Sequence, residues 1–325
     1  MPFPARGGPE AASSRPAGSC PSAKIQSIAG EPLARMPSSP MSPTAPTRPA
    51  PPAVLSFAAS DPTGGAGVQA DILTLACLGC HPLSVLTAIT VQDTAGVEGV
   101  LPVDPGWVAD QARALLEDIP VAAFKMGLLG SVEVIAAIAE VVADYPDIPL
   151  ILDPVLASGR GDQFADEEMI EAMIGLLLPQ TTLLTPNSLE ARRLAQQLGE
   201  GDEGGRGGSG LADCAHGLIN AGCEQVLITG THEGTAQVVN TLYGSHGVIR
   251  TDRWERLPGS YHGSGCTLAS AIAAHLARGV EIAEAVRGGQ EYTWRTLAAG
   301  YRPGMGQFIP DRLFWSREDD DGADA

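Results

Sequence analysis

The fold is decided by the stretch AVLSFAASDPTGGAGVQAD, which occupies residues 53–71. Its first six residues form a short apolar run, which predicts a buried β-strand. The proline and glycines of residues 60–67 predict a wide loop, and an apolar periodic pattern over residues 66–79 predicts a helix. A strand, a glycine-rich loop and a helix in this order are typical of the start of a βαβ unit in a parallel sheet.

The same alternation of strands and helices continues along the chain. Further strands are predicted at residues 82–91, 121–126, 149–153, 181–185 and 225–230, followed by a β-rich stretch over residues 238–257. Further helices are predicted at residues 105–118, 131–144, 187–198, 211–221, 265–278 and 281–299. The sequence therefore predicts an α/β fold with a central, mostly parallel sheet.

Composition narrows the classes of function. The chain has 325 residues, 44% of them hydrophobic, and a formal net charge of -18. No apolar run approaches the roughly 18 residues of a membrane span. A strongly negative protein repels nucleic acid and anionic lipid, because affinity for either depends on lysine and arginine. We therefore expect a protein without nucleic-acid or membrane partners.

Composition also predicts how the chain is organised. Residues 1–52 contain thirteen of the 26 prolines and no apolar periodicity, so we expect a disordered extension. One domain is expected over residues 53–317, with a flexible glycine-rich loop at residues 199–210. Residues 318–325 form an acidic tail.

The six cysteines, at positions 20, 77, 80, 214, 223 and 266, are scattered as in a cytoplasmic protein with reduced thiols. Cys77 and Cys80 form a C-x-x-C pair, but no second pair completes a zinc site. We expect two packed cysteines at the end of a helix.

The segment Tyr261-His262-Gly263-Ser264-Gly265-Cys266-Thr267 opens a predicted helix. Glycines allow close approach of a ligand, and the unpaired N–H groups of a helix start attract anions. The positive end of the helix dipole is expected to favour a thiolate at Cys266, which would then serve as a base. The alternative is a glycine-rich turn that ends in a packed cysteine.

A dinucleotide-binding loop is a weaker interpretation of the first loop. Gly65, Gly67 and Ala70 fit the spacing G-x-G-x-x-A. In dinucleotide-binding folds the first glycine follows the strand almost directly, whereas here a wider loop containing Pro62 intervenes. Asp93 also lies too far along the chain to be the ribose-binding acid.

Polar side chains follow several predicted strands, and ligands of open α/β sheets bind at the carboxyl ends of strands. Gln92 ends the second strand, and Asp153 ends a later one. Asn187 and Glu190 lie three residues apart where a helix begins. They form either a capping box or part of a site in which a carboxylate holds magnesium-bound water.

Six blocks together resemble the hydroxymethylpyrimidine/phosphomethylpyrimidine kinases of thiamine biosynthesis, which have the ribokinase-like three-layer α/β/α fold. The blocks are SDPTGGAGVQAD (60–71), VQDT (91–94), KMGLL (125–129), LDPV (152–155), TPNSLE (185–190) and HGSGCT (262–267). They follow the order found in the family, within residues 53–300. The resemblance covers most of the chain.

The resemblance implies a role for each matching position. Cys266 takes the catalytic position, where relatives of the ribokinase type usually have aspartate, and the three residues before it form the anion hole: Gly263, Ser264 and Gly265. Positions that line the substrate pocket are Ala59, Asp71, Gln92, Leu128 and Val155. ATP and Mg²⁺ are expected near Asp153, Asn187, Glu190, Thr229 and Gly230, with the metal held by Asp153 and Glu190 through water.

The sequence departs from the family pattern at several positions. Ala59 replaces a common glycine and Leu128 a common methionine. The loop 156–160 is short and lacks the usual lysine, and residues 229–232, TGTH, replace a lysine-containing segment. Arg160 is therefore a candidate for the missing phosphate contact.

The expected activity is ATP-dependent phosphorylation of 4-amino-5-hydroxymethyl-2-methylpyrimidine and then of its monophosphate. The first alternative is a pyridoxal or pyridoxine kinase, whose substrate also carries a hydroxymethyl group on a ring. The second is a non-catalytic sensor that binds the pyrimidine. The resemblance also implies a homodimer as a state to test.

Overall fold

The computed structural model describes residues 49–157, 161, 163–199 and 210–317. Several predictions fall wholly or largely outside the described residues. These are the disordered extension, the flexible loop after residue 199, the acidic tail, and the phosphate contact of Arg160.

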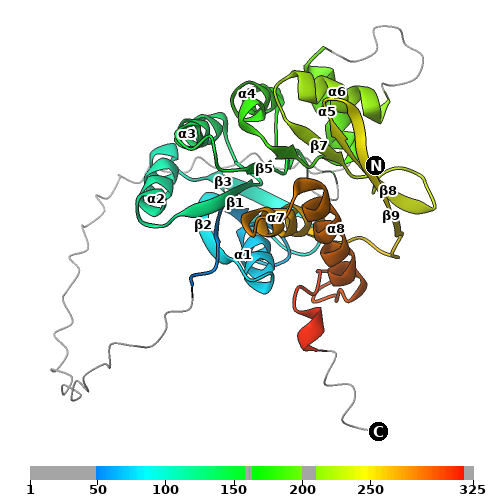
Figure 1. The fold of residues 1–325 in the computed structure, drawn as a ribbon. Helices are drawn as coiled ribbons and strands as arrows, with labels where there is room; N and C mark the ends of the chain where they lie inside the picture. Colours follow the sequence, from blue (N-terminus) through cyan, green and yellow to red (C-terminus); the bar gives the residue numbers. More distant parts are fainter. Residues whose placement is uncertain (1–48, 158–160, 162, 200–209, 318–325) are drawn as a thin grey trace, which may run out of the picture. The chain divides into compact units, whose positions relative to one another are not determined.

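A nine-stranded sheet lies at the centre of the described domain (Figure 1), with strand order β3-β2-β1-β4-β5-β6-β7-β8-β9. The strands are β1 (Ala53–Ser60), β2 (His81–Gln92), β3 (Val97–Pro102), β4 (Val121–Met126), β5 (Leu150–Leu152), β6 (Leu183–Leu184), β7 (Gln225–Ile228), β8 (Gln237–Gly244) and β9 (Gly247–Glu255). Strands β1, β2 and β4 to β7 are parallel, whereas β3, β8 and β9 join antiparallel at the two edges. The six parallel strands therefore point the same way, and their carboxyl ends lie side by side at one end of the sheet.

Helices cover both faces of the sheet (Figure 1). One layer contains α2 (Pro105–Asp118), α3 (Val132–Ala143), α4 (Glu167–Ala172), α5 (Ser188–Gln197) and α6 (Leu211–Asn220), and the other contains α1 (Gly67–Cys77), α7 (Ser264–Ala277) and α8 (Ile282–Ala298). Alternate strand residues pack against different layers: Leu55 and Phe57 join the core of the first layer, and Val54 joins the core under α1 and α7. The predicted three-layer α/β/α fold is confirmed.

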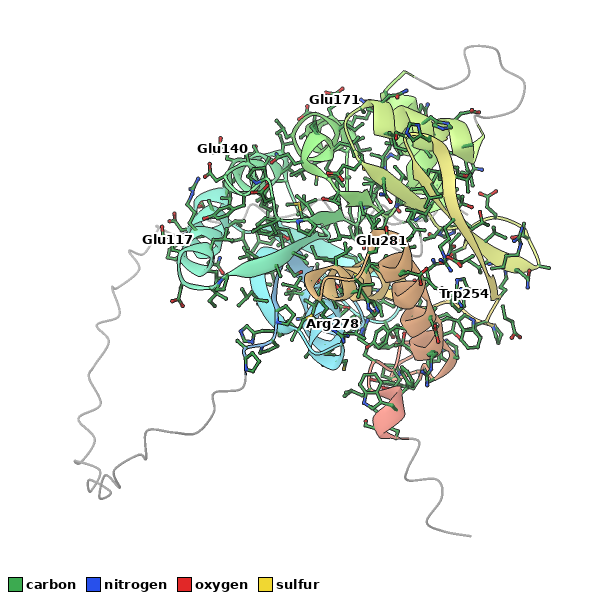
Figure 2. The ribbon with its side chains drawn as sticks, in the orientation of Figure 1. Glu117, Glu140, Glu171, Trp254, Arg278 and Glu281 are labelled. Atoms are coloured by element: carbon green, nitrogen blue, oxygen red, sulfur yellow. The ribbon has the colours of Figure 1, made fainter. Side chains whose placement is uncertain are left out.

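Charged side chains lie on the outer surface of the first layer. Figure 2 shows Glu117, Glu140 and Glu171 on α2, α3 and α4, and all three are exposed. No helix within the described ranges is long and apolar enough to cross a membrane.

Local sequence signals explain where the helices begin. The Asp104 carboxylate accepts hydrogen bonds from Gly106 N and Trp107 N, and Pro105 takes the first position of α2. The hydroxyl of Ser131 caps α3 in the same way by accepting from Val134 N. The predicted bounds of α2 and β4 agree with the structure to the residue.

Some elements were not predicted. Strand β3 has a glycine and a mostly exposed edge, which hides the period-two pattern. Residues 167–180 form α4, a five-residue π-helix (Met173–Leu177) and a 3₁₀ turn (Leu178–Gln180), so no single period runs through them. A second short 3₁₀ helix, Phe314–Ser316, follows α8.

The C-x-x-C pair packs against the second helical layer. Cys77 ends α1 and contacts the cluster of Ala271, Tyr292 and Phe314. Cys80 is buried, and its Sγ donates to Ala274 O at 3.6 Å. Burial raises the pKa of both thiols, as in packed cysteines.

Candidate active site

Asp61 organises the loop between β1 and α1. Its carboxylate, 2% exposed, accepts hydrogen bonds from Thr63 N (2.9 Å), Thr63 Oγ1 (2.9 Å) and Ala66 N (2.6 Å). His262 Nε2 lies 2.9 Å from the same carboxylate. Burial by itself would raise the pKa of Asp61, but the hydrogen bonds from His262, Thr63 and Ala66 lower it to about 2. Asp61 therefore joins the first loop to the residues that precede α7.

The start of α7 lies against this loop. Gly263, the residue before the helix, has φ of 78°. A Cβ on Gly263 would lie 1.9 Å from Gly65 O, so only glycine allows the two loops to approach this closely. The first N–H groups of α7 have no carbonyl partner within the helix, and this is the geometry expected of the predicted anion hole.

The predicted thiolate at Cys266 is wrong for the protein without ligands. Cys266 keeps a partly exposed surface, but dense packing around it raises the pKa of the thiol to about 12. The charge of Lys125 and the N–H of Gly67 lower this pKa without offsetting burial. The dipole of the helix start is thus weaker than desolvation at this position.

Asp71 lies beneath the site, fully buried on α1. Its carboxylate pairs with Lys125 Nζ at 2.9 Å and accepts from Ser56 Oγ (2.5 Å) and Ser270 Oγ (2.7 Å). Burial alone would lower the pKa of Lys125, but the charge of Asp71 outweighs it and raises this pKa. Contact of Asp71 with substrate stays a prediction, since its carboxylate already has three protein partners. The sequence signal for Lys125 was a single cation in the apolar strand VAAFKM.

Two carboxylates lie beside the start of α7 and α5. Asp153 is 5% exposed, and its Oδ2 is buried without a hydrogen-bond partner. A Cβ on Gly265 would lie 3.4 Å from this atom, so Asp153 faces the predicted anion hole. Burial raises the pKa of Asp153 to about 6. Burial and the charge of Asp153 raise the pKa of Glu190 to about 8.

The capping box predicted at α5 is present. Asn187 Oδ1 accepts from Leu189 N and Glu190 N, and Glu190 Oε2 accepts from Asn187 N at 2.9 Å. The other oxygen, Glu190 Oε1, accepts from Leu156 N in the loop after β5 at 3.4 Å. Glu190 therefore joins two strand-end loops, and its role with magnesium stays a prediction.

Four of the predicted pocket residues lie at or just after the carboxyl ends of neighbouring strands. Ala59 N donates to Leu128 O at 3.1 Å, with Ala59 buried and Leu128 half-buried. Gln92 is half-buried, and its Nε2 lies 3.0 Å from His262 Nε2. Val155 is half-buried two residues after Asp153. The structure thus links Gln92 to the same histidine that contacts Asp61.

The predicted nucleotide residues Thr229 and Gly230 lie beside α5 and β8. Thr229 O accepts from Ser188 N at 3.0 Å, and Gly230 N donates to Asn240 Oδ1 at 3.0 Å. A Cβ on Gly230 would lie 2.3 Å from Val239 O. Packing against β8 is therefore enough to require glycine at 230, and nucleotide binding by this pair stays a prediction.

The sequence analysis missed the segment after α8. Ile309 and Arg312 reach the first loop and α7, and Arg312 is 3% exposed although it lies near the chain end. The segment has no apolar period and no known motif, so its contribution depends on tertiary packing alone.

Comparison with known proteins agrees with the resemblance found in the sequence blocks. The family model described as phosphomethylpyrimidine kinase matches residues 61–311. A hydroxymethylpyrimidine/phosphomethylpyrimidine kinase of Mycobacterium tuberculosis is 40% identical over 264 residues, covering 80% of this chain and 94% of that protein. The thiamine biosynthesis bifunctional protein ThiED of Geobacter sulfurreducens is 36% identical, and the chain spans only 51% of its length.

Solved structures with the same fold include two kinds of kinase. Phosphomethylpyrimidine kinase from Clostridium difficile has a TM-score of 0.62 and 33% identity, covering 74% of this chain and 97% of that one. The pyridoxal kinase of Staphylococcus aureus in complex with pyridoxal has a TM-score of 0.72 and 27% identity, covering 82% and 96%.

Proposed function

The chain belongs to the phosphomethylpyrimidine kinase family, and from this premise we propose that it transfers the γ-phosphoryl group of ATP to 4-amino-5-hydroxymethyl-2-methylpyrimidine. The bond formed joins phosphorus to the hydroxymethyl oxygen, ADP leaves, and the hydroxyl proton passes to a base. A second transfer to the resulting monophosphate follows in the proposal. The observation that carries it is the start of α7, where Gly265, next to Cys266, lies against the unpartnered Oδ2 of Asp153.

Phosphoryl transfer requires mainly positioning and neutralisation of charge. In the proposed mechanism, the N–H groups at Gly263, Ser264, Gly265 and Cys266 stabilise charge on the transferring group. As the thiolate, Cys266 accepts the hydroxyl proton, and the charge of Lys125 favours this ionised form. Gln92 binds the ring edge, because an amide offers both a donor and an acceptor to an aminopyrimidine.

The donor set near Asp153 suits Mg²⁺. A buried carboxylate oxygen without a hydrogen-bond partner is a ligand that a hard cation would satisfy. We propose that Asp153 binds magnesium directly or through water and that Glu190 orients the water. Magnesium bound there supplies neutralisation of the ATP phosphates.

The proposal includes the surroundings of the enzyme. The partners are a small aminopyrimidine alcohol and ATP, and scattered cysteines without a disulfide among the described residues suit a reducing compartment such as the cytoplasm.

A coupled assay of ADP formation tests the function. Purified protein with ATP and MgCl₂ is expected to turn over the pyrimidine alcohol, and mass spectrometry is expected to find the monophosphate and then the diphosphate. Pyridoxal is the competing substrate, because the Staphylococcus aureus enzyme that resembles this chain is a pyridoxal kinase. A higher kcat/KM for pyridoxal than for the pyrimidine alcohol would favour the pyridoxal kinase alternative. Tight pyrimidine binding without ADP formation would favour the non-catalytic sensor.

A further inference from the structure

The segment after α8 folds back across three loops of the site. Early in this segment, Gly306 N donates to Oγ1 of Thr94, a residue of the loop after β2, at 3.0 Å. Phe308 then pairs with the residues before α7: Phe308 N donates to Ser260 O, and its carbonyl accepts from His262 N at 2.8 Å. The segment is therefore held by backbone hydrogen bonds where the predicted substrate loops meet.

Later in the same segment, the side chain of Arg312 is buried inside the protein. Its Nη2 donates to Gly65 O at 2.6 Å and to Thr267 Oγ1 at 2.9 Å, and its Nε donates to Thr267 Oγ1 at 3.1 Å. Nη1 lies 3.4 Å from Gly64 O. From α8, Tyr292 Oη donates to Arg312 O at 3.0 Å. One planar guanidinium thus joins the first loop to the first turn of α7.

The contacts of Arg312 continue to the N-terminal residue of the anion hole. Thr267 Oγ1 accepts from Arg312 and donates to Gly263 O at 2.8 Å. The carbonyl of Gly65, which also accepts from Arg312 Nη2, is the atom that a Cβ on Gly263 would meet first. Arg312 therefore holds both sides of the contact that fixes the start of α7.

The buried charge of Arg312 is unusual. Within the described ranges the guanidinium forms no ion pair, and the neighbouring Asp311 pairs instead with Arg317. Burying a cation among neutral carbonyl and hydroxyl groups is costly, and a methionine or leucine would pack with less desolvation. Stability alone does not account for arginine at this position, whereas its fork geometry accounts for the alignment of two loops.

We propose that Arg312 is a positioning residue that aligns the anion hole for phosphoryl transfer, by tying the Gly64-Gly65 turn to Thr267. This proposal rests on the proposed function, since it assigns a role in the same reaction. Arg312 does not touch the substrate in this role. Its effect belongs to the transition state, where the N–H groups of the α7 start must meet the transferring group.

The test compares Arg312→Met and Arg312→Lys with Arg317→Gln as the matched control, because Arg317 lies in the same segment but is largely exposed. Arg312→Met is expected to lower kcat about 10- to 100-fold, the size expected when donors of an anion hole are displaced. The KM values for ATP and for the pyrimidine alcohol are expected to stay within about threefold, because binding uses other residues. Arg312→Lys should lie between, and Arg317→Gln should match the wild type.

Thr267→Val tests the same path without removing the buried cation. It should also lower kcat, and the double variant with Arg312→Met should lose little more than the single variants, because both act through one linkage. If Arg312→Met does not fold, Arg312→Lys and Thr267→Val decide the question. An unchanged kcat in the folded variants would overturn the proposal. So would a double variant whose loss in kcat equals the product of the losses in the two single variants.

Hydrogen exchange keeps this result separate from the proposed function. Amides of the first hydrogen-bonded turn of α7, which begins with Thr267 N on Gly263 O, are expected to exchange faster in Arg312→Lys and Thr267→Val than in the wild type, whether or not the protein phosphorylates a pyrimidine. Faster exchange in a protein without pyrimidine kinase activity would sink the function but keep the linkage. Unchanged exchange at these amides would contradict the linkage itself.

Discussion

Cys266 lies at the start of α7 under the influence of opposite charges. Lys125 favours its thiolate, whereas Asp153 and Asp71 disfavour it, and burial is the largest effect. A thiol whose pKa is raised to about 12 keeps its proton at neutral pH in the free protein. Cys266 can accept the substrate proton only as the thiolate, so its proposed role as a base requires that this pKa fall when the ligands bind.

Substitutions at Cys266 test the role of the thiol. Cys266→Ala should lower kcat about 10²- to 10⁴-fold, the usual contribution of a general base, while ATP affinity stays nearly unchanged. Cys266→Asp should retain more activity than alanine, since aspartate is the usual residue there in relatives of the ribokinase type. Steady-state kinetics with circular dichroism as a folding control gives the rank order. Near-wild-type turnover of alanine together with unfolding of aspartate would make the thiol structural.

The raised pKa of Glu190 predicts how stability depends on pH. In the folded protein Glu190 keeps its proton until pH about 8, whereas in the unfolded chain it loses the proton near its ordinary value of 4.5. Between these values the folded state binds more protons, so this group makes stability fall as pH rises. Glu190→Gln keeps a capping oxygen and should gain stability relative to the wild type over the same window, levelling off above pH about 8.

Urea unfolding from pH 5 to 9 without magnesium measures this difference. Glu291→Gln, an exposed substitution on α8, is the control. A stability difference for Glu190→Gln that does not change with pH would show that the carboxyl is ionised throughout. Added MgCl₂ should remove most of the difference, because a bound cation stabilises the ionised carboxylate.

At the scale of elements, the parallel strands and most helices were predictable from periodicity alone. Residues 121–126 are bounded by clear turns and fully recovered as β4. Elements that lack a single hydrophobic period were not predicted. Strand β3 is mostly exposed, and the π-helix of residues 173–177 interrupts the helical pattern after α4. The motifs located the candidate site, but the ion pair of Asp71 with Lys125 and the fork of Arg312 join residues 54 and about 250 positions apart. No local pattern predicts such contacts.

Glycines flank α7 at both ends, and comparing the two positions distinguishes the cost of backbone strain from the cost of close approach between loops. Gly263 and Gly279 have φ near 80°, but a Cβ at 279 meets nothing within 4 Å, whereas at 263 it meets Gly65 O at 1.9 Å. Gly279→Ala should therefore cost about 1–2 kcal/mol, the penalty of the left-handed conformation. Gly263→Ala should cost more than about 4 kcal/mol or displace the first loop and abolish turnover. Chemical denaturation and kinetics of both variants give the comparison, and equal losses would mean that the loops separate easily.

At the scale of the molecule, the parallel order of six strands brings every candidate group to one edge. Gln92 ends β2, Asp61, Asp153 and Asn187 follow three other strands, and only the shared direction of those strands makes them neighbours. The segment after α8 adds contacts to the first loop and to the loop after β2. Family resemblance gave the positions of these groups, but the structure was needed to find which of them are already engaged by protein partners.

The last prediction concerns the boundary of the domain. A chain that begins at Pro49 should fold, with a melting temperature and kcat close to those of the full chain, because β1 begins at Ala53 and pairs with β2 and β4. The cut must leave Pro52, whose carbonyl accepts from His81 N at 2.9 Å. A chain that begins at Ser56 is the matched control: it loses the first three residues of β1, including the fully buried Val54 and Leu55, and is expected not to fold. Thermal melts and the coupled ADP assay compare the three proteins. Loss of most activity in the chain from Pro49, with its melting temperature intact, would assign residues 1–48 a role in catalysis and not in folding.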